Sequence, residues 1–146
     1  MERSELILKE DHMKGRINSQ LGSINISEDV ISTIAGSAAV ECFGVVGMAA
    51  VSVKDGFAKM LKRDSLQKGI EVSVEDEDRV SLRLHIIVAY SVNISAVAEN
   101  LIENVRYQVE EHTGLTVENI EVYVEGVLHD GMYRHYDGHL LTNINI

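Results

Sequence analysis

The fold is decided by one stretch of sequence, residues 70–115, which reads IEVSVEDEDRVSLRLHIIVAYSVNISAVAENLIENVRYQVEEHTGL. Apolar residues alternate along two segments of it, 69–75 and 79–90, as they do in β-strands with one buried face. An acidic turn separates the two segments, so we predict an antiparallel hairpin. The opposite face of the second strand becomes apolar at Ile87 and Ala89, so we expect something to cover that end, and we interpret it as a candidate interaction surface.

An amphipathic helix follows the hairpin. Its apolar residues recur every three or four positions from Ile94 to Val109, while glutamates occupy the other side. The helix should end at Gly114, because glycine adopts the left-handed conformation of a helix C-terminus. Alternating apolar residues from Ile120 to Val124 then predict another core strand.

A strand and a helix are also expected in the first third of the chain. Residues 21–26 alternate as a short strand, and Ser27 before two acidic residues is typical of a helix N-cap. The middle of this helix, residues 35–39, consists of small residues, which let a helix approach a sheet closely. Gly44 is the natural stop.

The expected order of elements along the chain is a strand, a helix, further strands, a second helix and a last strand. This order predicts an α+β fold. We expect a two-layer sandwich, with two main helices packed on one face of a mostly antiparallel sheet. The expected organisation is one domain at 21–127, an N-terminal extension at 1–20 and a C-terminal tail at 128–146.

Composition excludes several classes of protein. The chain has 146 residues, is 45% hydrophobic and carries a net charge of -10, which argues against a general affinity for nucleic acid. A single cysteine excludes an intrachain disulfide and a four-thiolate zinc site. The start of the chain lacks a signal-peptide pattern and the longest apolar run, 86–90, is too short to cross a bilayer, so we expect a cytoplasmic protein.

One segment, 54–68, is basic on this acidic chain. It is either a solvated linker or a docking surface for an acidic partner or an anionic surface. For docking, Lys59, Lys62 and Arg63 would supply the charge. Three residues nearby would supply an apolar anchor: Phe57, Met60 and Leu61.

The tail contains residues of the kind that bind Zn or Ni: His129, Asp130, His135, Asp137 and His139. Two Asp-Gly pairs indicate turns there, so a helix that aligns the histidines is not expected and we predict no metal ligand. We interpret the tail as a flexible or hairpin-like extension, docked through its apolar residues: Leu140, Leu141, Ile144 and Ile146.

No catalytic or cofactor-binding residue is predicted. Gly44 and Gly47 have the spacing of an RNA-clamping loop, but two valines between them on an acidic chain favour a helix stop followed by an apolar strand. Cys42 lies on the apolar side of the first helix and is interpreted as an inert thiol. His85 and His112 are interpreted as isolated.

Several of these segments together resemble the alkaline-shock-protein family of Gram-positive envelope stress response proteins. The resemblance extends from about Gly15 to Val127. The matching segments are GSINISEDVI at 22–31, IAG at 34–36, AAVE at 38–41, GVVGM at 44–48, TGLTV at 113–117 and VEGV at 124–127. Ser91 departs from the pattern, because the family commonly has glycine after the tyrosine.

The resemblance implies a non-catalytic cytoplasmic protein of envelope stress and homeostasis, with no cofactor. It implies self-association and a membrane-anchored protein partner at the inner face of the cell membrane, with peripheral membrane contact at most. A regulatory partner of a kinase resembling dihydroxyacetone kinase, which acts in fatty-acid use, is the alternative. An enzyme using the tail histidines and a nucleic-acid binder are weaker alternatives.

Overall fold

The computed structural model describes residues 14–50, 60–61, 63–129, 132–135 and 140–143. In chain order the elements are β1 (Lys14–Ser19), β2 (Gly22–Ser27), α2 (Glu28–Glu41), β3 (Val45–Met48), the 3-10 helix η1 (Arg63–Gly69), β4 (Ile70–Asp76), β5 (Arg79–Ala89), α3 (Ile94–Thr113), β6 (Thr116–His129), β7 (Met132–His135) and β8 (Leu140–Asn143).

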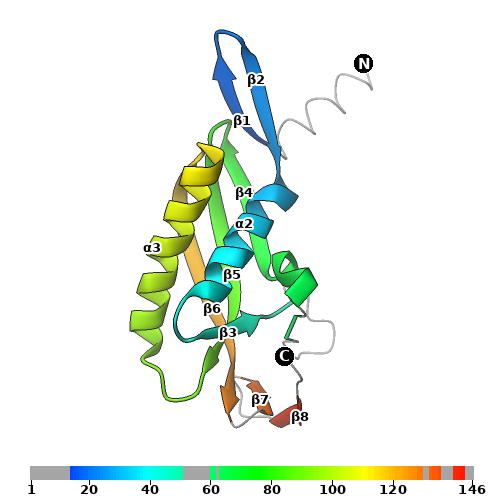
Figure 1. The fold of residues 1–146 in the computed structure, drawn as a ribbon, viewed down its shortest axis with the longest axis vertical. Coiled ribbons are helices and arrows are strands. Elements are labelled where there is room, and N and C mark those ends of the chain that lie inside the picture. Colours follow the sequence, from blue (N-terminus) through cyan, green and yellow to red (C-terminus); the bar gives the residue numbers. More distant parts are fainter. Residues whose placement is uncertain (1–13, 51–59, 62, 130–131, 136–139, 144–146) are drawn as a thin grey trace.

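The main sheet is built around β5. One edge of β5 pairs with β4 along its first half and with β3 along its second half, and both pairings are antiparallel. The other edge pairs with β6 in parallel, through the crossover helix α3, and β7 and β8 continue antiparallel from β6. Both helices lie on the same side of this sheet (Figure 1). The predicted α+β fold, with two helices on a mostly antiparallel sheet, is confirmed.

Both helices begin where the sequence predicts and α3 ends there too, whereas α2 ends at Glu41, slightly before the expected stop at Gly44. Ser27 caps α2 by accepting a hydrogen bond from the backbone of Val30, and the side chain of Asn93 caps α3 in the same way. Gly114 ends α3 with a φ of 75°, and its N–H donates to the carbonyl oxygen of Glu110.

Close approach of α2 to the sheet is seen at Gly36, where a Cβ would lie 3.5 Å from Cδ1 of Ile70 at the start of β4, but the nearer neighbour there is η1. A Cβ on Gly36 would lie 3.3 Å from the Cβ of Leu66, so α2 and η1 approach each other closely there. On the side of α2 that faces α3, the side-chain amide of Asn104 donates to the carbonyl oxygen of Ala38 at 3.1 Å. Branched apolar residues from the helices and from the sheet pack together and fill the core between the two layers.

The face of the sheet away from the helices, here called the outer face, has an apolar half at the end of β5. Ile87 is 0% exposed and forms a small cluster with Ala49 and Met60, which are joined by an isolated bridge. The expectation that something covers this end of the strand is confirmed. Burial of Ile87 also means that it is not available as an interaction surface.

The segments outside the expected central domain contain strands. β1 pairs with β2 as a separate two-stranded hairpin, and β6 runs on to His129. β7 and β8 follow in the tail, where no helix was expected. The apolar residues of the tail beyond Asn143 lie outside the described residues.

Candidate functional site

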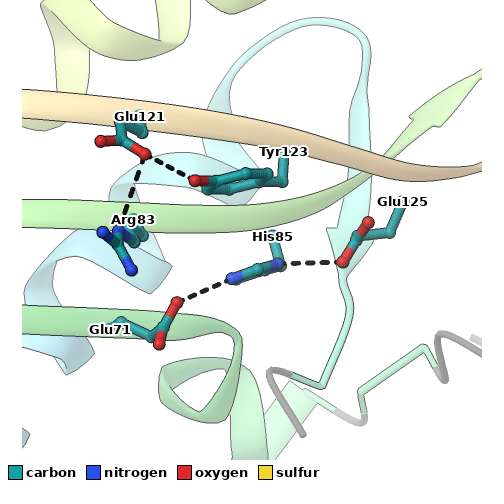
Figure 2. A network of polar contacts seen from close by, with 6 residues as sticks. All are labelled: Glu71, Arg83, His85, Glu121, Tyr123 and Glu125. Carbon is teal, nitrogen blue, oxygen red and sulfur yellow. Dashed lines mark hydrogen bonds and ion pairs between the residues drawn. The ribbon is translucent and has the colours of Figure 1, made fainter. Parts of the chain in front are cut away.

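The most concentrated polar chemistry in the described part of the chain lies on the outer face, next to the apolar half (Figure 2). His85 on β5 is 9% exposed. Its Nδ1 lies 3.0 Å from Oε2 of Glu125 on β6, and its Nε2 lies 3.1 Å from Oε2 of Glu71 on β4. The imidazole therefore joins three neighbouring strands across the sheet.

A second layer of contacts holds the ring in place. Tyr123 stacks on His85, with ring centroids 4.9 Å apart and planes 11° from parallel. The phenol of Tyr123 donates to Oε2 of Glu121 at 2.5 Å, and the same oxygen lies 3.6 Å from Nε of Arg83. The hydrogen bond to Glu121 raises the pKa of Tyr123, because it stabilises the protonated phenol.

The strand pairing explains why these residues meet. The paired residues are Glu71 with Arg83 and His85 with Tyr123, so all four side chains lie on one face. Register shifts in β6 leave Glu118 and Glu125 as extra residues opposite β5, as in β-bulges. Both glutamates bind a basic side chain of β5, because Glu118 pairs with Arg79 at 3.0 Å and Glu125 contacts His85.

The bulge at Glu125 also changes which residues of β6 face outward. Before it, Tyr123 lies on the outer face; after it, Leu128 joins the apolar cluster around Ile87. The same shift turns Val127 toward the main core. One inserted residue therefore separates the polar half of the outer face from the apolar half.

The geometry favours structural pairing over catalysis. Both ring nitrogens already contact carboxylates on opposite sides, so the two glutamates do not converge on a common ion. Within the described residues, no three His, Cys, Asp or Glu side chains form a group that could hold a metal.

A polar depression adjoins the network over β4, β5 and β6. Its lining includes three glutamates and Arg83, and the glutamates are Glu71, Glu75 and Glu121. The depression contains hydroxyl, carboxylate and guanidinium groups but, among the described residues that line it, no paired nucleophile and base. It is a surface with hydrogen-bonding capacity.

The prediction that His85 is isolated is wrong. The alternation of β4 and β5 contains part of the signal, because an antiparallel hairpin places Glu71 near the face of His85. The contact with Glu125 depends on the parallel pairing and the bulge, which the sequence does not reveal. His112 has a weaker environment, since it is exposed and its Nε2 contacts only the side chain of Gln108 among the contacts described, at 3.1 Å.

The interpretation of the basic segment as a docking surface is changed by Met60. This residue is buried beside Ile87, so it cannot serve as an apolar anchor for a partner. Leu61 is half-buried against the main core. The segment at 51–59, with Phe57 and Lys59, lies outside the described residues, as does Lys62.

Two further interpretations concern the end of α2. Gly44, with a φ of 89°, leads from the end of α2 into β3, so the interpretation as a helix stop and strand start is confirmed. A Cβ at Gly44 would lie 2.6 Å from Val97. The thiol of Cys42 is half-buried, between the carbonyl oxygen of Ala38 and the amide of Asn104.

The tail histidines are only partly described. His129 ends β6, and its ring meets that of Tyr90 edge-on with centroids 4.0 Å apart. His135 ends β7. The remaining members of the predicted cluster, Asp130, Asp137 and His139, lie outside the described residues.

Fold and outer face together define a small α+β protein whose most prominent polar groups bind one another. The model of the alkaline shock protein family, which is described as having a "cell envelope-related function", matches residues 16–129. The chain belongs to this family.

Relatives from Gram-positive bacteria support this membership. "Uncharacterized protein YloU" of Bacillus subtilis is 39% identical over 116 residues, which cover 79% of this chain and 96% of the relative. "Uncharacterized protein Spy1614" of Streptococcus pyogenes is also 39% identical over 116 residues, with 79% and 95% coverage. A second Bacillus subtilis protein, "Uncharacterized protein YqhY", is 32% identical over 127 residues, with 85% and 87% coverage. No solved structure matches the chain.

Neither of the two described α-helices is both long and apolar enough to cross a lipid bilayer.

Proposed function

We propose that this chain is a non-catalytic interaction protein of envelope stress and homeostasis. It self-associates and binds a membrane-anchored protein partner at the cytoplasmic face of the cell membrane. The observation that carries the proposal is the match of residues 16–129 to a family with an envelope-related function.

The geometry of the outer face supports a non-catalytic role. His85, the most buried ionisable side chain described there, has both ring nitrogens in contact with glutamates. The phenol of Tyr123 is likewise bound to Glu121. Groups that bind one another in this way within the chain support a role in stabilising this surface.

The test is a pull-down from membranes. The tagged full chain is expressed at its natural level, cross-linked in cells, solubilised with mild detergent and weighed by native mass spectrometry. We expect several copies of the chain together with a protein that has a membrane-spanning segment. A soluble kinase in equal amount, without a membrane protein, would instead support the kinase alternative, and a bare monomer would contradict the proposal.

A variant of the basic segment tests whether this segment binds the partner, and a variant of α3 is the control. Reversing Lys59, Lys62 and Arg63 together to glutamate should abolish recovery with membranes if the segment holds the partner. The matched control reverses Glu99 and Glu103, which lie on α3, to lysine. Unchanged recovery of the first variant would remove segment 54–68 from the proposed binding surface.

A further inference from the structure

The β1–β2 hairpin projects beyond both helices, and its base is fixed to the body (Figure 1). The backbone N–H of Arg16 donates to the carbonyl oxygen of Glu77 at 2.6 Å, and the side-chain amide of Asn18 donates to Oε2 of Glu77 at 2.8 Å. A Cβ at Gly15 would lie 2.5 Å from Leu115, so the base also packs tightly. In the described part of the chain, the two strands pair only with each other.

The hydrogen bond of Arg16 reveals which backbone groups of β2 point away from the hairpin. Arg16 faces Asn25 across the hairpin and donates outward, so this is a non-hydrogen-bonded pair. The backbone groups of Asn25 therefore also point outward, and by alternation so do those of Ser23. Among the described residues, no backbone hydrogen bond joins Ser23 or Asn25 to another element.

One face of the hairpin is apolar, and this face extends past the body. Ile17 lies directly opposite Ile24, on the same face as Ile26. Ile17 and Ile26 are half-buried against the main core, whereas Ile24 is 56% exposed. Leu21 in the turn is 100% exposed.

The hairpin is also a place where two copies of an acidic chain can meet. The chain carries a net charge of -10, yet residues 17–27 contain no charged side chain. Acidic surfaces of two copies repel each other, so an uncharged segment is a favourable place for the copies to meet. An isolated two-stranded hairpin is marginally stable, and added strands with a shared apolar face stabilise it.

We propose that the outer edge of β2 pairs with the outer edge of β2 in a second copy. The two strands run antiparallel about a two-fold axis at Ile24 and form a four-stranded sheet from two hairpins. This inference rests on the self-association in the proposed function and gives it a surface.

The proposed register follows from the direction of the backbone groups. Ser23 lies opposite Asn25 of the second copy, and these outward-pointing residues exchange backbone hydrogen bonds. Ile24 lies opposite Ile24 of the second copy, which joins the apolar faces of the two hairpins. A centre nearer Ser27 would bring the α2 helices of the two copies together, because α2 follows β2 directly.

A charge-swap experiment tests this register. The variant S23E/N25E places glutamates opposite each other twice across the two-fold axis, and like charges in this position destabilise strand pairing. The matched variant S23K/N25E changes the same two exposed positions but places a lysine opposite a glutamate twice. Association of the full chain is measured by sedimentation equilibrium, and circular dichroism checks that each monomer is folded.

We expect the wild type to associate, S23E/N25E to associate at least about tenfold more weakly, and S23K/N25E to associate at least as tightly as the wild type. Wild-type assembly that S23E/N25E leaves unchanged would overturn the β2 contact but leave self-association standing. A wild type that stays monomeric at about 100 µM would overturn both.

Discussion

The outer face of the sheet and the β1–β2 hairpin differ in how their groups are used. The outer face contains histidine, tyrosine, arginine and glutamate side chains, but these bind one another within the chain. The hairpin has few charged groups, yet it leaves the backbone of Ser23 and Asn25 and the side chain of Leu21 outward and exposed. Residues with obvious chemistry thus stabilise the fold here, and the plainer segment has the capacity to bind.

The largest expected effect separates the packed body from the hairpin. Leu84→Ala should lower the free energy of unfolding by about 2–5 kcal/mol, because Leu84 is fully buried and its loss leaves a cavity. Leu21→Ala should change it by less than about 0.5 kcal/mol, because Leu21 is already exposed. Urea unfolding at low protein concentration measures the free energy of unfolding of both variants. A large loss of stability in Leu21→Ala would mean that the turn packs on the body.

The next effect tests the outer face. His85→Leu keeps a similar volume but leaves Glu71 and Glu125 without the ring, and we expect a loss of about 1–2 kcal/mol in the free energy of unfolding. His112→Leu is the matched control and should change little, because His112 is exposed. Equal effects of the two substitutions in urea unfolding would show that the His85 contacts add nothing to stability.

A smaller effect, this time a gain in the free energy of unfolding, is expected for a substitution of Ser91. This residue has a φ of 70° in the turn between β5 and α3. Glycine adopts this left-handed conformation without steric cost. Ser91→Gly should raise the free energy of unfolding by about 0.5–1 kcal/mol, since part of the gain is lost to the greater freedom of the unfolded chain. Thermal unfolding at one pH is sufficient to measure it, and a lower melting temperature would contradict the assigned conformation.

The smallest effect concerns ionisation rather than stability. The pKa of Tyr123 is raised by its hydrogen bond to Glu121, with smaller contributions from burial and the negative charge of Glu121. Glu121→Gln removes that charge and should lower the pKa of Tyr123 toward the ordinary value of tyrosine. Ultraviolet absorbance titration measures phenolate formation, and Tyr123→Phe identifies the contribution of this residue. An unchanged titration would mean that the phenol is not bound to Glu121 in solution.

Local sequence patterns were sufficient for α2, α3, β2, β4 and β5 because each is set by neighbouring residues, but β1, in the expected N-terminal extension, was not predicted. The periodicity of α3, the left-handed Gly114 and the hairpin of β4 and β5 depend on contacts within a few positions, and all are observed. The parallel pairing of β5 with β6 joins residues distant in sequence, for example His85 and Glu125, which are 40 positions apart. A bulge in that pairing decides which residues meet, and no local pattern reveals it.

The same limit explains the two changed interpretations. Met60 and Ile87 are apolar residues in different segments, and each taken alone fits an exposed docking surface. The structure joins them through the bridge from Met60 to Ala49, which buries both. The exposure of Ile24, in contrast, follows from the hairpin projecting beyond the body, which is a property of the assembled fold.

The most direct test of the central claim is a disulfide across the proposed two-fold axis. Facing residues in a non-hydrogen-bonded antiparallel pair have Cα atoms about 4.5 Å apart, which suits a disulfide. Ile24→Cys is made together with Cys42→Ser, and Thr33→Cys in the same background is the control, because Thr33 is exposed on α2. The account predicts rapid formation of a covalent dimer from Ile24→Cys under mild oxidation and little from Thr33→Cys; equal rates, or no dimer from either, would contradict it.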